Sequence, residues 1–255
     1  MEVEMIRQTC KVFVLALLAL AWTSMAMAEC RLWQQIQSSG FFTVGTSPDY
    51  PPFESIDDNG NIVGFDIDLI RAVAAEMGLE VRLRGMGFDS ILIAVRSGQV
   101  HLGMSSFSVT EERKRSVDFT IPYYSSGQVV LVNADSDIRT VEDLKGKVVS
   151  AQIGSTSADA AQAIEGATAR IVDDASTAVM MLRNKAADGV VLDVAIAENY
   201  VQRFGFVQMD EPLNYEEVAA VIRKGCPEFL DALNEAFKKV KTSGKLDELR
   251  QKWDV

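Results

Sequence analysis

Short apolar runs typical of buried strands alternate with helix-like segments along most of this chain. The strand predicted at 41–45 is followed by a helix at 66–77, which places Ile67, Ile70 and Val73 on one face. Such alternation is typical of parallel-rich sheets covered by helices on both faces, so the sequence predicts a compact α/β protein. Further strands are predicted at 81–83, 100–104, 128–132, 148–152, 170–172 and 189–192, and further helices at 32–37, 89–97, 141–144, 157–165, 177–184, 194–204, 227–241 and 246–253.

The N-terminal segment has the composition of an export signal. Its apolar run at 12–21 is shorter than the roughly 20 residues that a membrane span needs, and basic residues precede it. A small-residue pattern at 26–28 is typical of a signal-peptidase site. The sequence therefore predicts a signal peptide at residues 1–28, cleaved after Ala28, and a soluble periplasmic product that is not inserted in the membrane.

Charge and cysteine usage exclude several classes of function. The formal net charge is −11 and no basic run occurs, which argues against nucleic acid and anionic membrane surfaces as partners. The one histidine is His101 and no CxxC pair occurs, so we expect neither a metal site nor a cofactor. Removal of the signal peptide leaves Cys30 and Cys226 in an oxidising compartment, which favours a disulfide between them over two unrelated cysteines.

The segment from Ser105 to Arg113 has the features of an anion site. Serines follow a predicted strand, Thr110 is a suitable N-cap for a short charged helix, and Arg113 then lies in its first turn. The free N–H groups of a helix N-terminus and an arginine fork together bind a small carboxylate. The alternative is a capped surface helix whose Arg113 pairs with Glu111 or Glu112, and spacing alone does not decide between the two.

Five motifs place this segment in a wider pattern. They are GTSPDYPPFES, GFDIDLIRAVAAEMG, SSFSVTEERKRSVDFTIPYY, VEDLKGKVV and ADGVVLD, in that order. Over residues 41–253 the chain resembles the extracellular amino-acid-binding proteins of bacterial ABC transporters, the family of the glutamine- and lysine/arginine/ornithine-binding proteins. The resemblance implies a two-lobed periplasmic-binding-protein-like fold of type II, with two α/β lobes joined by two hinge crossings. Lobe 1 would comprise residues 29–127 and 217–255, and lobe 2 residues 128–216.

The resemblance also assigns a partner to each charge of a bound amino acid. Arg113 would grip the α-carboxylate with a bidentate geometry that lysine cannot supply, and Asp193 would hold the ammonium. The alternative for Asp193 is an ordinary N-cap of the helix at 194–204. The other assigned contacts are the carbonyl of Ser106 to the ammonium, the hydroxyl and N–H of Ser108 to the ligand, the N–H of Thr156 to the carboxylate, and the rings of Tyr50 and Phe88 on the sides of the ligand.

Three further positions bear on the side chain of the ligand. Ser47 occupies a position where relatives that bind glutamine or basic amino acids commonly have an aspartate. Gln152 and Leu192 occupy positions where the glutamine binder has a lysine and a histidine. Since no charge is evident for the ligand side chain, the sequence predicts an uncharged L-amino acid.

The predicted function is the periplasmic substrate-binding component of an ABC transporter, a monomer that closes around its ligand and delivers it to the membrane permease. The alternative is an enzyme similar to cyclohexadienyl dehydratase, acting on prephenate or arogenate, which needs a positioned acid in the cleft. Glu216 and Glu217 are its candidates, although acidic hinge residues are more often solvated. A sensory input domain is a third possibility, but no membrane span or kinase-like segment follows Trp253.

Overall fold

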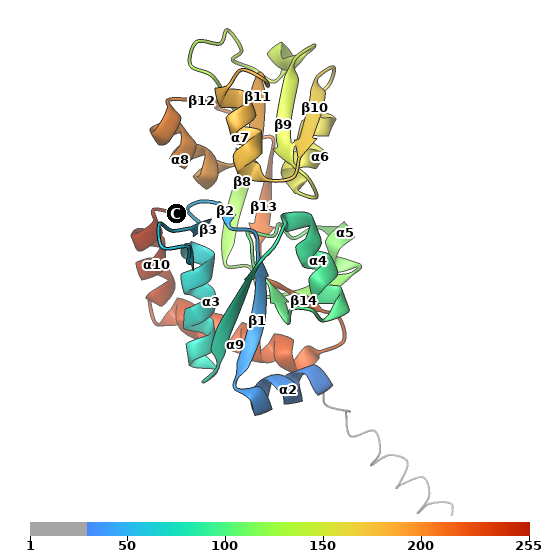
Figure 1. The fold of residues 1–255 in the computed structure, drawn as a ribbon, viewed down its shortest axis with the longest axis vertical. Coiled ribbons are helices and arrows are strands. Elements are labelled where there is room, and N and C mark those ends of the chain that lie inside the picture. The colour runs from blue at the N-terminus through green and yellow to red at the C-terminus, as the bar shows by residue number, and fades with distance from the viewer. Residues whose placement is uncertain (1–29) are drawn as a thin grey trace, which may run out of the picture.

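The computed structural model describes residues 30–255, which form two mixed β-sheets arranged one above the other along the long axis of the molecule (Figure 1). The predicted signal peptide and its cleavage site lie outside these residues. In the first sheet, β1 (Phe41–Thr46) pairs in parallel with β5 (Glu80–Gly85) and β6 (Leu102–Gly103). β14 (Val221–Arg223) lies antiparallel between β6 and β7 (Val117–Phe119).

The second sheet is built from the middle of the chain. Its parallel pairs join β9 to β10 and β11, and β8 is antiparallel to its neighbours. The sheets are therefore less purely parallel than the alternation of elements predicts, because β8 and β14 run against their neighbours. The strands are β10 (Thr168–Val172), β9 (Val148–Gln152), β11 (Gly189–Asp193), β8 (Tyr124–Val132) and β12 (Val207–Gln208), in spatial order, and β13 (Asn214–Val218) also pairs with β8.

Two adjacent strands connect the sheets. β8 follows β7 of the first sheet and leads into the second, and β13 returns beside it toward β14, paired from Tyr124 opposite Val218 to Gln128 opposite Asn214. The predicted crossings at 125–129 and 217–220 overlap these strands. The predicted limits of the lobes, 29–127 with 217–255 and 128–216, stay a prediction.

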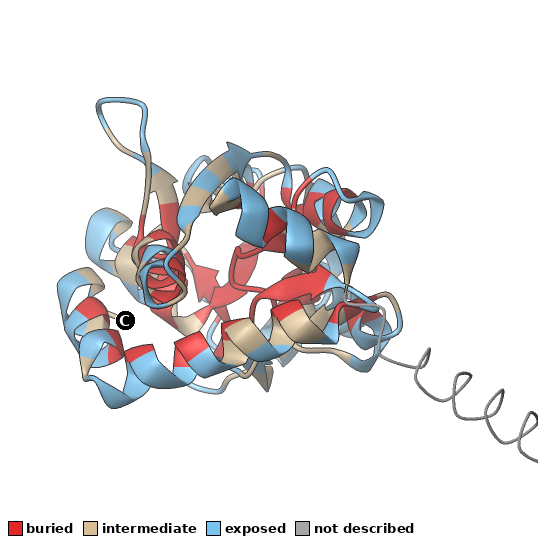
Figure 2. Cartoon of the chain, turned by 90° about the horizontal axis from the view of Figure 1, so that it is seen from below, coloured by how far each residue is buried: buried red, intermediate tan, exposed pale blue. Residues whose placement is uncertain are grey.

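Helices lie on both sides of each large sheet, and their buried faces are turned inward (Figures 1 and 2). The helix predicted at 89–97 begins one residue earlier than expected, at Phe88, so that Asp89 lies in its first turn and Gly87 is its N-cap. In chain order the helices are α2 (Arg31–Ser39), α3 (Phe65–Glu76), α4 (Phe88–Ser97), α5 (Glu111–Lys114), α6 (Thr156–Ala163), α7 (Ala175–Arg183), α8 (Val194–Phe204), α9 (Pro227–Thr242) and α10 (Lys245–Trp253), with a 3-10 turn, Glu142–Leu144, where a helix was expected.

A small third sheet carries part of the site described below. It consists of β2 (Asp49–Tyr50), β3 (Glu54–Ile56) and β4 (Ile62–Val63). Behind it, the ring of Phe53 is 2% exposed and packs edge-on against Phe65 at 5.5 Å between ring centroids. This sheet is thus anchored on the core of the first lobe.

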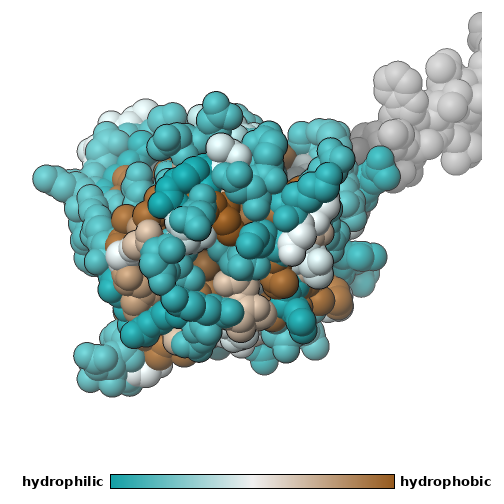
Figure 3. All heavy atoms as spheres, turned by 90° about the horizontal axis from the view of Figure 1, so that it is seen from above, coloured by the Kyte–Doolittle hydropathy of each residue, from teal (hydrophilic) through white to brown (hydrophobic). Residues whose placement is uncertain are grey.

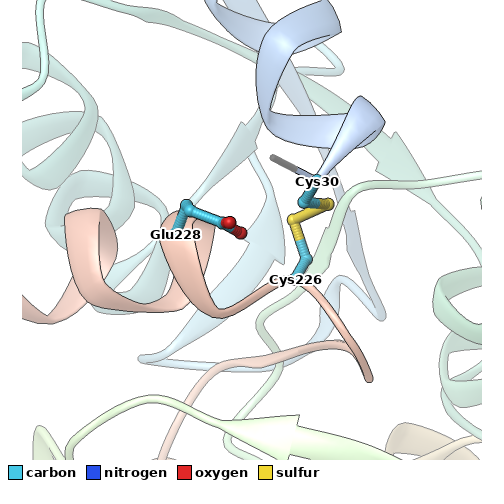
Figure 4. A group of neighbouring side chains, drawn as sticks. All are labelled: Cys30, Cys226 and Glu228. Atoms are coloured by element: carbon cyan, nitrogen blue, oxygen red, sulfur yellow. A yellow bond between two sulfur atoms is a disulfide. The ribbon is translucent and has the colours of Figure 1, made fainter. Parts of the chain in front are cut away.

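A disulfide joins the start of the described chain to the segment before its two C-terminal helices. Cys30 and Cys226 form a disulfide with an S–S distance of 2.04 Å, which links the start of α2 to the start of α9 (Figure 4). The predicted disulfide is therefore present. Glu228 lies beside it, but the two sulfur atoms are bonded to each other and are not free thiolates for a metal.

Two further observations concern the surface and the helices. Seen from the end of the second sheet, the molecule is mostly hydrophilic, with small, separated hydrophobic groups (Figure 3). Among residues 30–255, none of the helices combines the length and the apolar character required to cross a membrane.

Candidate ligand-binding site

A cavity is lined by residues of the second sheet, by residues of the small sheet and by residues that follow strands of the first sheet. Its empty volume, open solvent included, is about 420 Å³. All of the predicted binding residues except Ser47 line it. The predicted residues in its wall are Tyr50, Phe88, Ser106, Ser108, Arg113, Gln152, Thr156, Leu192 and Asp193, and the wall also contains Asp49, Glu54, Ser105, Ser155, Ser157, Ala175 and Val191.

Arg113 reaches this cavity because of the local sequence. The hydroxyl of Thr110 accepts the backbone N–H of Arg113 at 3.1 Å, which caps α5 and fixes the arginine in its first turn. The guanidinium donates from Nη1 to the carbonyl of Ser108 at 2.8 Å and from Nη2 to the carbonyl of Gly154 at 3.0 Å. Arg113 therefore joins residues that follow β6 in the first sheet and β9 in the second.

The surroundings of Arg113 keep it in place without an ion pair to its helix neighbours. Glu111 instead pairs with Lys114 at 2.8 Å. The guanidinium carbon lies 5.4 Å from the ring centroid of Phe107, and Arg113 is only 8% exposed. Burial lowers the pKa of Arg113, and the carboxylate of Glu216 is the largest opposing influence. The result is a buried cation with donors available to an anion.

Asp193 is the anionic counterpart on the second sheet. It ends β11 and occupies the N-cap position of α8, but its side chain does not cap that helix. Its Oδ2 accepts the hydroxyl of Tyr50 at 2.9 Å, and the same hydroxyl accepts the backbone N–H of Asp193 at 3.2 Å. Burial raises the pKa of Asp193 to about 6, while the hydrogen bond from Tyr50 lowers it. Asp193 is therefore the N-cap residue of α8, as the alternative predicts, but its carboxylate bonds the hydroxyl of Tyr50 and not the N–H groups of the helix.

The two sheets also meet at a pair of hydroxyl groups. Ser155 caps α6 by accepting the N–H of Ala158 at 3.1 Å, so Thr156 is the first helical residue and is 9% exposed. Its Oγ1 lies 3.0 Å from the Oγ of Ser108 and donates to the Oε2 of Glu216 at 2.7 Å. The helix N-terminus, with its free N–H groups, thus faces the same cavity as Arg113.

Ser106 adopts a backbone conformation that is uncommon for a residue with a side chain, with φ at 50°. Its N–H donates to the Oδ2 of Asp66 at 2.9 Å, and the hydroxyl of Tyr123 donates to the same oxygen at 2.7 Å. Asp66 is fully buried, so this turn is held from within the core of the first lobe.

Ser47 is predicted to face the ligand, but it does not line the cavity. Its hydroxyl donates to the Oδ1 of Asp49 at 2.7 Å, and Asp49 lines the wall instead. The Oδ2 of Asp49 accepts the Nε2 of Gln152 at 3.0 Å and the backbone N–H of Ala175 at 2.7 Å. Asp49 is a site residue that the sequence analysis missed, although it directly precedes Tyr50 in the first motif.

Glu54 is the second missed residue. It is 1% exposed, and its Oε1 accepts the hydroxyl of Ser105 at 2.7 Å, whereas no hydrogen-bond partner among the described residues reaches its Oε2. Burial raises the pKa of Glu54 well above its usual range, and the neighbouring charge of Asp66 raises it further. Burial also raises the pKa of Asp66 to about 7. Burial thus favours the protonated form of both acids.

The remaining predictions fall outside the cavity wall. Glu216 and Glu217, on β13, are not among the residues that line it. Glu217 is exposed. His101, the one histidine, accepts the backbone N–H of Thr43 on its Nδ1 at 3.1 Å, and burial lowers its pKa.

Comparison with known proteins gives a consistent set of relatives. The bacterial extracellular solute-binding proteins, family 3, match residues 42–254. The chain is 33% identical to the arginine-binding extracellular protein ArtP of Bacillus subtilis (strain 168), covering 94% of this chain and 96% of that one.

Solved structures give the same result. A mutant of ArgBP from T. maritima has a TM-score of 0.83 and 37% identity, covering 87% of this chain and 98% of that one. The ancestral amino acid-binding protein AncCDT-1, described as a precursor of cyclohexadienyl dehydratase, has a TM-score of 0.83 and 36% identity, covering 88% and 99%. These matches confirm the predicted two-lobed α/β fold.

Proposed function

The chain belongs to the bacterial extracellular solute-binding proteins, family 3, and from this premise we propose that it captures a free amino acid for the permease of an ABC transporter. ArtP and ArgBP are named for arginine and AncCDT-1 for amino acids. A relative's ligand does not by itself transfer to this chain, so the proposal depends on the chemistry of the cavity.

The observation that carries the proposal is the opposition of Arg113 and Asp193. Both are more than nine-tenths buried, they come from different lobes, and they line one cavity. Burial of single charges is costly unless each has a partner. A zwitterion offers a carboxylate to Arg113 and an ammonium to Asp193, so it satisfies both at once. The N-terminus of α6 at Thr156 adds donors for the carboxylate.

The side chain of the ligand would then lie near Asp49, Glu54 and Gln152. The sequence predicts an uncharged side chain because Ser47 occupies a position where relatives that bind glutamine or basic amino acids commonly have an aspartate. Asp49, two positions after Ser47, supplies a carboxyl group in the place of that aspartate. The Oε2 of Glu54 is buried without a hydrogen-bond partner among the described residues. After the ligand's ammonium is assigned to Asp193, this end of the cavity holds acidic groups and no cation. We therefore propose a side chain rich in hydrogen-bond donors, with L-arginine as the first candidate, in preference to an uncharged one.

Closure follows from the same division of contacts. Arg113 and Ser108 lie on the first lobe and Thr156 and Asp193 on the second, so one ligand reaches all four only when the lobes are together. A ligand that contacts both lobes stabilises the closed state by its additional contacts there. The closed protein would be the form that the permease binds, and the protein would act as a monomer.

The enzyme alternative has less support. Its candidate acids, Glu216 and Glu217, are absent from the cavity wall, and the relatives reported above are named for binding. Turnover of prephenate or arogenate by the purified protein would overturn this conclusion.

The proposal is tested by calorimetry on refolded, ligand-free mature protein with a panel of L-amino acids and prephenate. We expect L-arginine to bind most tightly. Asp49→Asn should weaken L-arginine about tenfold or more and L-glutamine much less, because a charge-assisted hydrogen bond is lost only for the cation. Asp58→Asn, an exposed substitution in the same segment, is the matched control.

Each outcome has a defined meaning. Equal weakening of both ligands by Asp49→Asn would show that Asp49 only holds its loop, and would refute the proposed side-chain class. Tightest binding of a neutral amino acid would restore the uncharged prediction. If none of the L-amino acids bound measurably, the proposal that the ligand is an amino acid would be refuted.

A further inference from the structure

Glu216 lies outside the cavity, yet it contacts a residue that lines it. Thr156 faces both the cavity and an outer groove, and Glu216 is part of the wall of that groove. Glu216 belongs to β13, one of the two strands that connect the sheets. Its carboxylate therefore reaches the site from behind, through the hydroxyl of Thr156.

The hydroxyl of Thr156 has more neighbours than hydrogens. Its Oγ1 lies 2.7 Å from the Oε2 of Glu216, 2.6 Å from the amide of Gln128 and 3.0 Å from the Oγ of Ser108. A threonine hydroxyl has one hydrogen to donate and two lone pairs to accept with. Since a carboxylate only accepts, the Thr156 hydrogen is directed toward Glu216.

The orientation of the Gln128 amide decides which oxygen receives the Thr156 hydrogen, but it does not change the direction of the Ser108 contact. In one orientation, the Nε2 of Gln128 donates to the hydroxyl of Thr156. In the other orientation, the amide oxygen of Gln128 accepts the N–H of Ser157 at 2.9 Å and competes with Glu216 for the hydroxyl hydrogen of Thr156. In both cases the hydrogen of Thr156 is directed away from Ser108. Ser108 must then supply the hydrogen of the 3.0 Å contact.

From this arrangement we propose that Glu216 is a positioning residue that fixes the direction of the hydrogen bond from Ser108 to Thr156. With its hydrogen committed to Thr156, the Ser108 hydroxyl offers only lone pairs to the cavity. A group with lone pairs alone accepts from an ammonium and is a poor partner for a second carboxylate oxygen or a carbonyl. Glu216 thereby contributes to selection of the ligand's amino group. This inference rests on the proposed function, since it assumes an amino acid in the cavity.

A second role of Glu216 must be separated from the first. It is the largest of the charges that raise the pKa of Arg113, so its removal also changes the field in the cavity. A change of field acts with or without the Thr156 hydroxyl, whereas positioning acts only through that hydroxyl. A double-mutant cycle distinguishes them.

The test compares L-arginine with 5-guanidinopentanoate, which has the same side chain and carboxylate but no amino group. Glu216→Leu, which removes the acceptor, should weaken L-arginine about tenfold, the effect of impairing one hydrogen bond to a charged group, and the desamino acid less than about twofold. In a Thr156→Val background, which keeps the backbone N–H but lacks the hydroxyl, Glu216→Leu should have no further effect. Glu217→Leu, the same change on the next and exposed residue of β13, should alter neither affinity.

Two results would overturn the inference. Equal weakening of both ligands would show that Glu216 does not select the amino group, and a full effect in the Thr156→Val background would show a field effect only. If the wild-type protein bound no amino acid, the proposed function would fail first. Coupling between Glu216 and Thr156 in urea unfolding would still report whether their contact exists.

Discussion

Replacement of Arg113 by lysine keeps the charge but removes the fork. The arginine has five N–H donors, of which two already serve the carbonyls of Ser108 and Gly154 at 2.8 and 3.0 Å. The rest remain for the ligand's carboxylate. A lysine has three donors at one point and cannot serve both carbonyls and a carboxylate together. We therefore expect Arg113→Lys to lose about one charge-assisted hydrogen bond to the ligand.

The magnitude follows from that single loss. A hydrogen bond to a charged group contributes about 1.5–3 kcal/mol, and each 1.4 kcal/mol is about a factor of ten in affinity. The dissociation constant for the preferred amino acid should rise by about 10- to 150-fold. Calorimetry on refolded protein measures it, and Arg115→Lys, on the exposed side of the same segment, is the matched control.

Affinity within about twofold of wild type for Arg113→Lys would refute this reasoning. It would mean that Arg113 acts as a point charge, or that its fork is fully occupied by the two carbonyls. Urea unfolding of the variant separates a binding defect from a folding defect, because the carbonyl contacts exist without the ligand.

Two predictions concern stability. The Cys30–Cys226 disulfide closes a loop with a sequence separation of 196, and the loss of chain entropy in the unfolded state should stabilise the fold by up to about 5 kcal/mol. Replacing both cysteines by serine should therefore lower the urea midpoint and leave ligand affinity unchanged, since neither cysteine lines the cavity. An unchanged midpoint would contradict this stabilisation. Burial raises the pKa of Asp66 from 3.8 to about 7, so the folded chain retains a proton that the unfolded chain releases, and the free energy of unfolding falls as pH rises from about 4 to about 7. Asp66→Asn should lessen this fall by up to about 4 kcal/mol, and urea unfolding across that pH range measures it. If the unfolding free energies of the variant and the wild type changed in parallel with pH, Asp66 would not be the group that causes the fall.

The parts of the site that were predictable are those with local signals. Thr110 and Arg113 are three positions apart, and the capping hydrogen bond between them fixes the side chain in one turn. Asp193 ends a strand whose apolar run is continuous in the sequence. These signals come from neighbouring residues alone, so the helix or strand and the site residue on it could be predicted together from the sequence.

The parts that were missed depend on contacts between distant segments. Asp49 is a wall residue because Gln152 and Ala175 approach it from the second lobe. Glu54 is buried because the first lobe folds over it, and no periodicity in the sequence marks a carboxyl group with an unpartnered oxygen. Ser47 was assigned by position alone, and its hydroxyl is turned to Asp49 instead.

The position of β14 in the first sheet sets an order of assembly. This strand, Val221–Arg223, lies between β6 and β7, and α9 and α10 follow it. All strands of the second sheet come before it in the chain. A chain emerging from the ribosome or from a secretion channel can therefore complete its second sheet while the first is still open. The first lobe is completed last, when the C-terminal segment arrives.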